Sequence, residues 1–146
     1  DDQDTVTGAR GMEVTMDEKL SEIDDQCDLV VLPGGIPGVP NLKANSKVQA
    51  MVKAQNDRGG YVAAICAGPT ALGAFGVLAD KNATCYPGCE DQLMAKHHST
   101  EPVVVDGNVI TSRGVGTAIE FALKLVEILI DRQTADDLAE KIVYKR

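Results

Sequence analysis

Apolar positions in this sequence form short continuous runs as well as stretches with helical spacing. Residues 28–32 and 61–65, in CDLVVLPGG and GGYVAAIC, are mainly apolar runs of the kind typical of strands buried on both faces. The apolar stretch 102–114 is interrupted by Asp106-Gly107, which predicts a hairpin with a tight turn. Shorter β-prone pieces predict a hairpin within residues 5–16, followed by a polar loop, and a short strand within residues 82–88.

Helical spacing predicts five helices, over residues 45–58, 69–75, 90–98, 116–130 and 134–143. In the first, Asn45 or Ser46 caps the start, Gly59 ends the helix, and one face holds Val48, Met51, Val52 and Gln55. The helix over 116–130 is the most clearly amphipathic, with a predicted inner face of Ile119, Ala122, Leu123, Val126 and Ile130. Strands that alternate with helices predict an α/β fold with a largely parallel sheet.

The composition narrows the class of protein. With 146 residues, 44% of them hydrophobic, the chain is expected to form a single domain over residues 1–146. A net charge of −8 argues against nucleic-acid binding, which needs a basic surface. No apolar run approaches the roughly 18–20 residues of a membrane span, so no membrane partner is expected. Four cysteines, too few and too scattered for a disulfide scaffold, favour a reducing, cytoplasmic setting.

Two chemically distinctive turns follow the two continuous strands. Gly34-Gly35 ends one strand and Cys66 ends the next, and sites in parallel sheets lie at the carboxyl ends of strands. A cysteine on a strand-to-helix turn is exposed, and the dipole and free amides of the following helix favour its thiolate. The amides of Ala67 and Gly35 are then predicted to form an oxyanion hole. The alternative is that Cys66, a commonly buried residue type, packs inertly in the core.

Three motifs, LVVLPGG, AAICAGPTAL and ITSRGVGTAIEFALKLVEIL, resemble the ThiJ/PfpI superfamily, in the branch of the parkinsonism-associated deglycase and its bacterial relatives. The similarity runs from about residue 5 to the C-terminus. It implies a flavodoxin-like three-layer sandwich, usually a homodimer, with Cys66 as the reactive centre and the Gly34-Gly35 turn as anion-stabilising backbone. Activities implied by the resemblance are glyoxalase chemistry without glutathione, proposed deglycation, and oxidative-stress sensing or chaperoning.

The sequence departs from the family's pattern at its start. Members of the family open with strand, helix and strand, and a glutamate there hydrogen-bonds the reactive cysteine, but no position in this sequence matches it. Without that unit the edge of LVVL would be unpaired, an arrangement that invites aggregation. We therefore expect a chain incomplete at its N-terminus and inactive in isolation. The missing segment would come from a companion chain or peptide, or would have been removed by cleavage.

Three further groups are candidate site residues. His97 or His98, at the end of a short predicted helix, suits a general base near the reactive thiol, and the alternative is a solvated helix end. Arg113, at a strand end, would bind a substrate anion or anchor an acidic loop. Cys85 and Cys89 fit a zinc site only loosely, because CYPGC spans a strand end and a turn, so neither a metal nor another cofactor is expected.

The leading functional hypothesis is a cysteine-dependent glyoxalase, of the hydro-lyase type, or a deglycase, a hydrolase. In this hypothesis Cys66 adds to a small reactive carbonyl such as methylglyoxal, the two amides hold the oxyanion, and a hydroxy acid such as lactate is released. The alternative is a non-enzymatic redox sensor or chaperone that responds to oxidation of Cys66. A peptidase is a weaker third hypothesis, because the residues establish no Cys-His-acid triad.

Overall fold

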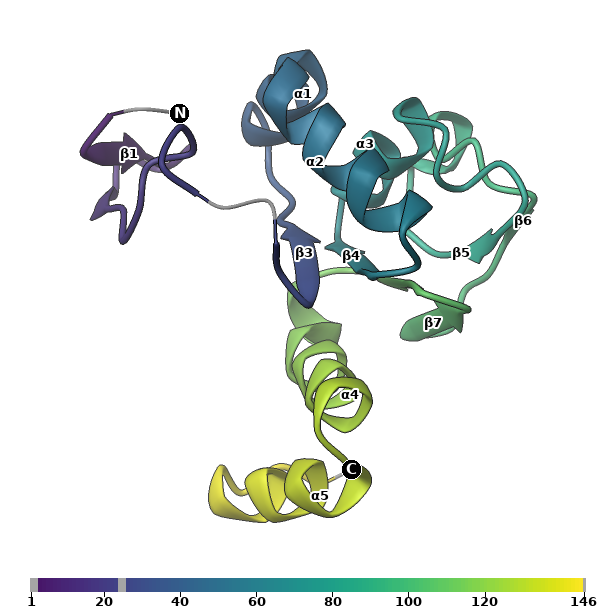
Figure 1. Cartoon of the computed structure of the whole chain (residues 1–146). Helices are drawn as coiled ribbons and strands as arrows, with labels where there is room; N and C mark the ends of the chain where they lie inside the picture. Colours follow the sequence, from purple (N-terminus) through teal and green to yellow (C-terminus); the bar gives the residue numbers. More distant parts are fainter. Residues whose placement is uncertain (1–2, 24–25, 146) are drawn as a thin grey trace.

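The computed structural model describes residues 3–23 and 26–145, in which strands alternate with helices (Figure 1). The main strands are β3 (Leu29–Leu32), β4 (Tyr61–Ile65), β7 (Val103–Asp106) and β8 (Val109–Ser112). The helices are α1 (Gly38–Ala44), α2 (Ser46–Asp57), α3 (Pro69–Ala74), α4 (Ala118–Leu129) and α5 (Arg132–Lys141). The shorter elements are β1 (Thr5–Thr7), β2 (Glu13–Thr15), β5 (Asn82–Ala83), β6 (His97–His98), and the 3₁₀ turns η1 (Glu90–Gln92) and η2 (Val115–Thr117).

The central sheet has the strand order β3-β4-β8-β7. Strands β3, β4 and β8 run parallel, and β7 joins β8 as an antiparallel hairpin. Because Asp106 pairs with Val109, the hairpin turn consists of Gly107 and Asn108, one residue later than predicted, and Gly107 takes a φ of 62°. The predicted α/β fold with a mostly parallel sheet is confirmed.

Side chains of the sheet pack in two separate cores, because successive residues of a strand point to opposite faces. Val62 and Ala64 of β4 belong to the core beneath α1, α2 and α3. Ala63, between them, packs in a second core with Ile110 of β8 and Phe121 of α4. The two groups of helices therefore lie on opposite faces of the sheet, which gives the molecule three layers (Figure 1).

Strand β3 is less buried than the continuous apolar run predicted. Leu32 is buried, but the side chain of Val31 is 43% exposed. The reason is its position, because among the described residues β3 pairs only with β4 and forms an edge of the sheet. One row of its backbone groups therefore has no strand partner in the described part of the chain.

The buried Gln55 ties α2 to the beginning of the sheet. Its side-chain amide donates hydrogen bonds to the carbonyl oxygens of Cys27 (3.1 Å), Asp28 (3.1 Å) and Tyr61 (3.3 Å). These bonds satisfy a polar group that burial would otherwise destabilise. The start of α2 is fixed as predicted, since the Asn45 side chain accepts hydrogen bonds from two amides of the first turn, at 3.0 and 3.2 Å.

The helix predicted over residues 90–98 is wrong, and α1 was not predicted. Only η1 is helical in that stretch, after which Leu93 enters the core beside α3 and Met94 takes a left-handed φ of 51°. His97 and His98 then form β6, which pairs in parallel with β5. Burial of Leu93 and the reversal at Met94 thus override the helical pattern of the sequence.

The inner face of α4 also differs from the prediction. Phe121, Leu125 and Ile128 pack on the sheet. Of the predicted face, Leu123 is buried and Val126 half-buried, whereas the other three residues are exposed: Ile119, Ala122 and Ile130. The helix contacts both the sheet and α5, so two of its sides are covered instead of one stripe. A single amphipathic face is therefore not enough to orient this helix.

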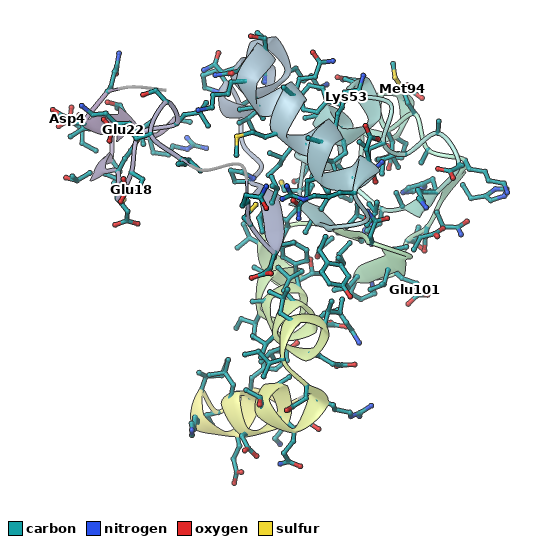
Figure 2. The ribbon with its side chains drawn as sticks, viewed as in Figure 1. Asp4, Glu18, Glu22, Lys53, Met94 and Glu101 are labelled. Carbon is teal, nitrogen blue, oxygen red and sulfur yellow. The ribbon has the colours of Figure 1, made fainter. Side chains whose placement is uncertain are left out.

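The predicted N-terminal hairpin is confirmed as β1 and β2, which pair antiparallel. Its segment carries acidic side chains that project outward, among them Asp4, Glu18 and Glu22 (Figure 2). Asp4 forms an ion pair with Lys19 at 2.9 Å, and Lys47 of α2 donates a hydrogen bond to the carbonyl of Leu20. None of the helices in the described ranges combines the length and apolar character needed to cross a membrane.

Replacement of Gly73 by alanine is expected to destabilise the fold. A Cβ at this position would lie 2.0 Å from the Leu93 carbonyl oxygen, so α3 and the segment after η1 would have to separate. We expect a loss of about 2–3 kcal/mol in the free energy of unfolding, measured by urea denaturation. Gly116→Ala is the matched control, since its Cβ would meet nothing within 4 Å. Equal stability of the two variants would contradict this packing.

Candidate active site

Cys66 occupies a sharp turn between β4 and α3, as predicted, and residues 65–68 are called the elbow below. Its φ is 65°, in the left-handed region that residues with a side chain rarely adopt. Its N–H donates to the Ser112 carbonyl (3.0 Å), and its carbonyl accepts from the Tyr86 N–H (2.8 Å). The ends of β8 and β5 thus hold the strained turn from two sides. The Cys66 side chain is only half-buried, so the core does not enclose it.

The end of β3 approaches the elbow so closely that side chains are excluded. A Cβ on Gly34 would lie 2.5 Å from the Cys66 Cβ and 3.1 Å from its Sγ. A Cβ on Gly68 would lie 2.7 Å from the carbonyl oxygen of Leu32. Glycine at both positions is what allows the ends of β3 and β4 to meet. The two turns singled out in the sequence are therefore adjacent in space.

The elbow leaves one backbone donor without a partner. In residues 66–71, all of which are described, the N–H groups of Cys66, Gly68, Thr70 and Ala71 donate to carbonyls, and Pro69 has no N–H. The N–H of Ala67, directly after the thiol, has no acceptor among the described residues. The same holds for the N–H of Gly35 in residues 3–23 and 26–145. These are the two donors predicted for an oxyanion, on neighbouring turns.

Tyr86 is an elbow neighbour that the sequence interpretation missed. Besides its backbone bond to Cys66, its ring lies against Gly114, whose Cβ would be 3.3 Å from the Tyr86 Cδ2. The side chain is 50% exposed and brings a phenol to the ends of β4 and β8. The available signal was the Pro87-Gly88 pair that follows it, because such a pair predicts a tight turn that returns the chain.

Cys85 and Cys89 lie near Cys66, and the three are called the elbow thiols. Cys85 is fully buried, and burial raises its pKa to about 11, with nearby negative groups adding to the effect. Cys89 is half-buried, and burial followed by the charge of Cys66 raises the pKa of its thiol, while Lys43 opposes the rise. Within residues 3–23 and 26–145, no group of three His, Cys, Asp or Glu side chains is placed to hold a metal ion.

The structure places His97 and His98 in a strand and not at the predicted helix end. Both side chains are exposed in β6, at the outer edge of the molecule beside β5 and β7 (Figure 1). They line a surface hollow together with Ser99 and Val104. In the described part of the chain neither imidazole is hydrogen-bonded to Cys66. Their predicted role as general base therefore gains no support from a direct contact.

Arg113 follows β8 and contacts the loop before β7, so loop anchoring has a direct contact and anion binding stays a prediction. Its Nη1 donates to the Thr100 carbonyl at 3.3 Å. The guanidinium also lies close enough to Glu90 to contribute to holding the pKa of that carboxyl below its ordinary value, after the amide hydrogen bonds of Glu90 and Gly88. The Arg113 Nε is buried without a hydrogen-bond partner among the described residues.

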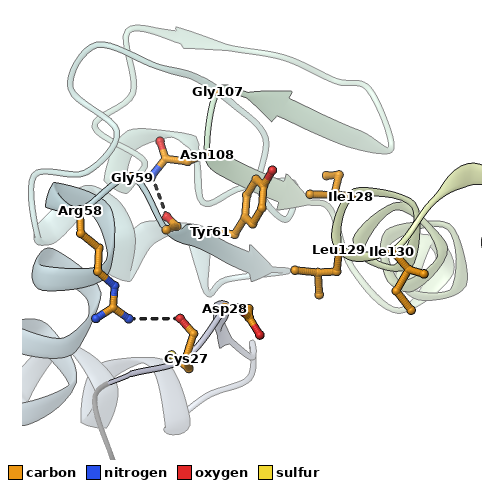
Figure 3. Close-up of a pocket in the computed structure, with 11 residues that line it drawn as sticks. Cys27, Asp28, Arg58, Gly59, Tyr61, Gly107, Asn108, Ile128, Leu129 and Ile130 are labelled. Carbon is orange, nitrogen blue, oxygen red and sulfur yellow. Dashed lines mark hydrogen bonds between the residues drawn. The ribbon is translucent and has the colours of Figure 1, made fainter.

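A cavity of about 780 Å³ lies at the opposite end of the sheet from the elbow (Figure 3). Its walls include Tyr61, the first residue of β4, whereas Cys66 follows the last. Two hydrogen bonds connect residues that line this cavity (Figure 3). Arg58 donates to the Cys27 carbonyl (3.1 Å), and Asn108 donates to the Gly60 carbonyl (2.9 Å). Because β4 spans roughly 16 Å at about 3.3 Å per residue, this cavity is remote from the reactive thiol.

A three-layer sandwich around a mostly parallel sheet, with a cysteine elbow at the carboxyl end of a strand, defines a class of α/β proteins with an exposed nucleophile. The model of the DJ-1/PfpI family matches residues 1–128 of this chain. The chain therefore belongs to the DJ-1/PfpI family, and its fold is the flavodoxin-like sandwich of that family.

Individual relatives agree with this assignment. The chain is 40% identical over 148 residues to the Parkinson disease protein 7 homolog of Danio rerio, covering 98% of this chain and 78% of the relative. It is 35% identical over 137 residues to the glutathione-independent glyoxalase DJR-1.2 of Caenorhabditis elegans, covering 92% and 73%. The structure of oxidized DJ-1 from Toxoplasma gondii has a TM-score of 0.94 at 34% identity, covering 100% of this chain and 80% of that one.

Gly34→Ala is expected to disturb the elbow, because its Cβ would collide with that of Cys66. We expect alkylation of Cys66 by iodoacetamide to change by about tenfold or more, together with a stability loss of about 1–3 kcal/mol. Gly38→Ala, at the start of α1 and with a Cβ that meets nothing within 4 Å, is the control. An unchanged alkylation rate in Gly34→Ala would show that the close approach does not position the thiol.

Cys85 is expected to resist alkylation in the folded protein. A rise in its pKa from 9.0 to about 11 lowers the thiolate fraction at pH 8 about a hundredfold, and burial slows access further. Because the pKa of the Cys85 thiol is raised in the folded protein, the contribution of this thiol to the free energy of unfolding is fully present below pH 9. That contribution is lost as the pH rises towards 11. Mass spectrometry of protein alkylated with and without denaturant measures the protection, and equal rates would contradict it.

Proposed function

We propose that this protein is a cysteine-dependent glyoxalase that acts on small α-oxoaldehydes such as methylglyoxal, with Cys66 as the nucleophile. The observation that carries the proposal is the elbow, where the half-buried Cys66 thiol, at a φ of 65°, is followed by the unpaired amide of Ala67 and closely approached by the Gly34-Gly35 turn. Family membership supports it, since the C. elegans relative is described as a glutathione-independent glyoxalase. Deglycation of methylglyoxal-modified groups would use the same thiol.

In the proposed reaction the Cys66 thiolate adds to the aldehyde carbon of methylglyoxal. The new S–C bond converts the carbonyl into a hemithioacetal alkoxide, which the Ala67 and Gly35 amides stabilise. The hydrogen on that carbon then moves as a proton to the neighbouring ketone carbon through an enediol, which leaves a lactoyl thioester. Water cleaves the thioester, releases lactate and restores the thiol. The net change is the addition of one water to methylglyoxal.

The proton transfer requires a general base near the hemithioacetal carbon. The family resemblance assigns this role to a glutamate hydrogen-bonded to the cysteine. Glu90, the acid whose charge acts on Cys85 and Cys89, instead accepts a hydrogen bond from the Gly88 amide at 2.8 Å. His97 or His98 would act only in support. The proposal therefore rests on the nucleophile and its amides and not on the identity of the base.

A second candidate function is redox sensing or redox-controlled chaperoning through Cys66. The similar T. gondii protein is described in an oxidized form, and the half-buried thiol of Cys66 is open to small oxidants. In that case oxidation to the sulfenic or sulfinic acid would be the functional event, and no carbonyl chemistry would be needed.

Lactate formation from methylglyoxal tests the leading proposal on the full-length protein. We expect Cys66→Ala to reduce the rate to background, because the covalent intermediate is lost. Cys27→Ala is the matched control, since Cys27 lines the remote cavity at the other end of the sheet, and its rate should stay within about twofold of wild type.

Two results would reject the proposal that this protein is a Cys66-dependent glyoxalase. One is lactate formation by Cys66→Ala at the wild-type rate, which would exclude Cys66 as nucleophile. The other is a wild-type protein that forms no lactate while peroxide oxidises Cys66 selectively, which would favour the redox sensor.

A further inference from the structure

Cys89 is a half-buried thiol beside the elbow that the proposed reaction does not use. Two consecutive backbone hydrogen bonds connect it to Cys66. The Cys66 carbonyl accepts from the Tyr86 N–H at 2.8 Å, and the Tyr86 carbonyl accepts from the Cys89 N–H at 3.0 Å. The second bond closes a tight turn through Pro87 and Gly88, where Gly88 has a φ of 92°. This turn folds Cys89 back toward the elbow.

Contacts beyond the backbone connect the segment that carries Cys89 to the helix that follows the Gly34 turn. The Cys66 Sγ lies near Gly34, at the start of the loop that leads into α1. Lys43, in the last turn of α1, donates to the Gln92 side chain at 3.2 Å and so joins that helix to the segment carrying Cys89. Cys89 also packs against the core cluster that contains Ala67, the residue after the nucleophile. Cys89 therefore directly precedes η1, which is joined to α1, and the loop beside the Cys66 sulfur leads into the same helix.

We propose that Cys89 is the resolving thiol of Cys66, so that hydroperoxides switch the elbow reversibly into a Cys66–Cys89 disulfide. The Cys66 thiolate attacks a peroxide oxygen, breaks the O–O bond and becomes a sulfenic acid, while hydroxide or alkoxide leaves. The Cys89 sulfur then attacks the Cys66 sulfur, an S–S bond forms, the S–O bond breaks, and the departing hydroxide takes the Cys89 proton as water. The peroxide is reduced by two electrons, and an external dithiol restores both thiols.

Electrostatics favours Cys89 over Cys85 as the partner. Cys66 exerts the largest charge effect on the Cys89 thiol, whereas Glu90 exerts the largest charge effect on the Cys85 thiol. Conversion of the Cys66 thiolate into a neutral sulfenic acid removes that repulsion before the Cys89 sulfur attacks. Cys85, by contrast, is fully buried, and burial raises the pKa of its thiol to about 11.

The segment that must adjust is short and exposed. A disulfide requires Cα atoms within about 7 Å, and residues 86–88, between the two hydrogen bonds, are all exposed. The three residues of this turn belong to neither core cluster. The switch acts on the same Cys66 that is proposed as the nucleophile and rests on the reactivity of that thiol, not on lactate formation.

Peptide mapping of the full-length protein tests the switch. The protein is treated with one equivalent of hydrogen peroxide, free thiols are alkylated, and trypsin digestion follows without reduction. Cleavage after Arg58, Lys81 and Lys96 puts Cys66 in peptide 59–81 and both other elbow thiols in peptide 82–96. We expect the two peptides to be linked in wild type and in Cys85→Ser, and not in Cys89→Ser. Circular dichroism checks that each variant is folded.

Excess peroxide supplies a second measurement. We expect Cys89→Ser to accumulate about tenfold more sulfinic acid at Cys66 than wild type or Cys85→Ser, because the sulfenic acid is no longer captured. Linked peptides that persist in Cys89→Ser, a bridge formed only within peptide 82–96, or as much sulfinic Cys66 in wild type as in Cys89→Ser would each overturn the proposal. Failure of the proposed glyoxalase function can be distinguished from failure of the switch. In that case the protein forms no lactate, but the linked peptides are still found.

Discussion

The close approach of the ends of β3 and β4 is the constraint on which the site depends. A Cβ at Gly34 would overlap Cys66, and a Cβ at Gly68 would overlap the backbone of Leu32. Glycine at these two positions therefore allows the chain to leave the neighbouring parallel strands β3 and β4 at the same edge of the sheet. The same contact brings the loop that contains Gly35 beside the thiol. The close pairing of β3 with β4 therefore also determines what surrounds the nucleophile.

Around that contact, hydrogen bonds of backbone groups fix most of the geometry of the elbow. Ser112 and Tyr86 hold the two ends of the Cys66 peptide unit, and the hydrogen bonds within residues 66–71 leave the Ala67 amide unpaired. A turn fixed in this way keeps a left-handed φ of 65° at a residue with a side chain, a strain of roughly 1–3 kcal/mol that the surrounding fold must offset. The elbow thiols lie where the ends of β4 and β5 converge, which places nucleophilic and redox chemistry at one location.

Local signals in the sequence predicted some elements well and others poorly. The α2 helix followed from Asn45 and the spacing of its apolar residues, because its cap and its inner face are both local properties. The helix expected over 90–98 failed because Leu93 is buried beside Gly73, and Met94 reverses the chain. Tyr86 was overlooked for a related reason, since its proximity to Cys66 comes from a hydrogen bond between residues twenty positions apart in the chain.

The sequence by itself determined the alternation of strands and helices, the glycine turn, and the position of Cys66 at the end of a buried strand. These features depend on neighbouring residues, and the order of elements in an α/β chain fixes which strand ends share an edge. Only the tertiary structure decided which amides stay unpaired, which side of α4 is inward, that Cys89 is close enough to Cys66 for their charges to interact, and that His97 and His98 lie exposed in β6. Those outcomes depend on hydrogen bonds and packing between distant segments, which no local pattern encodes.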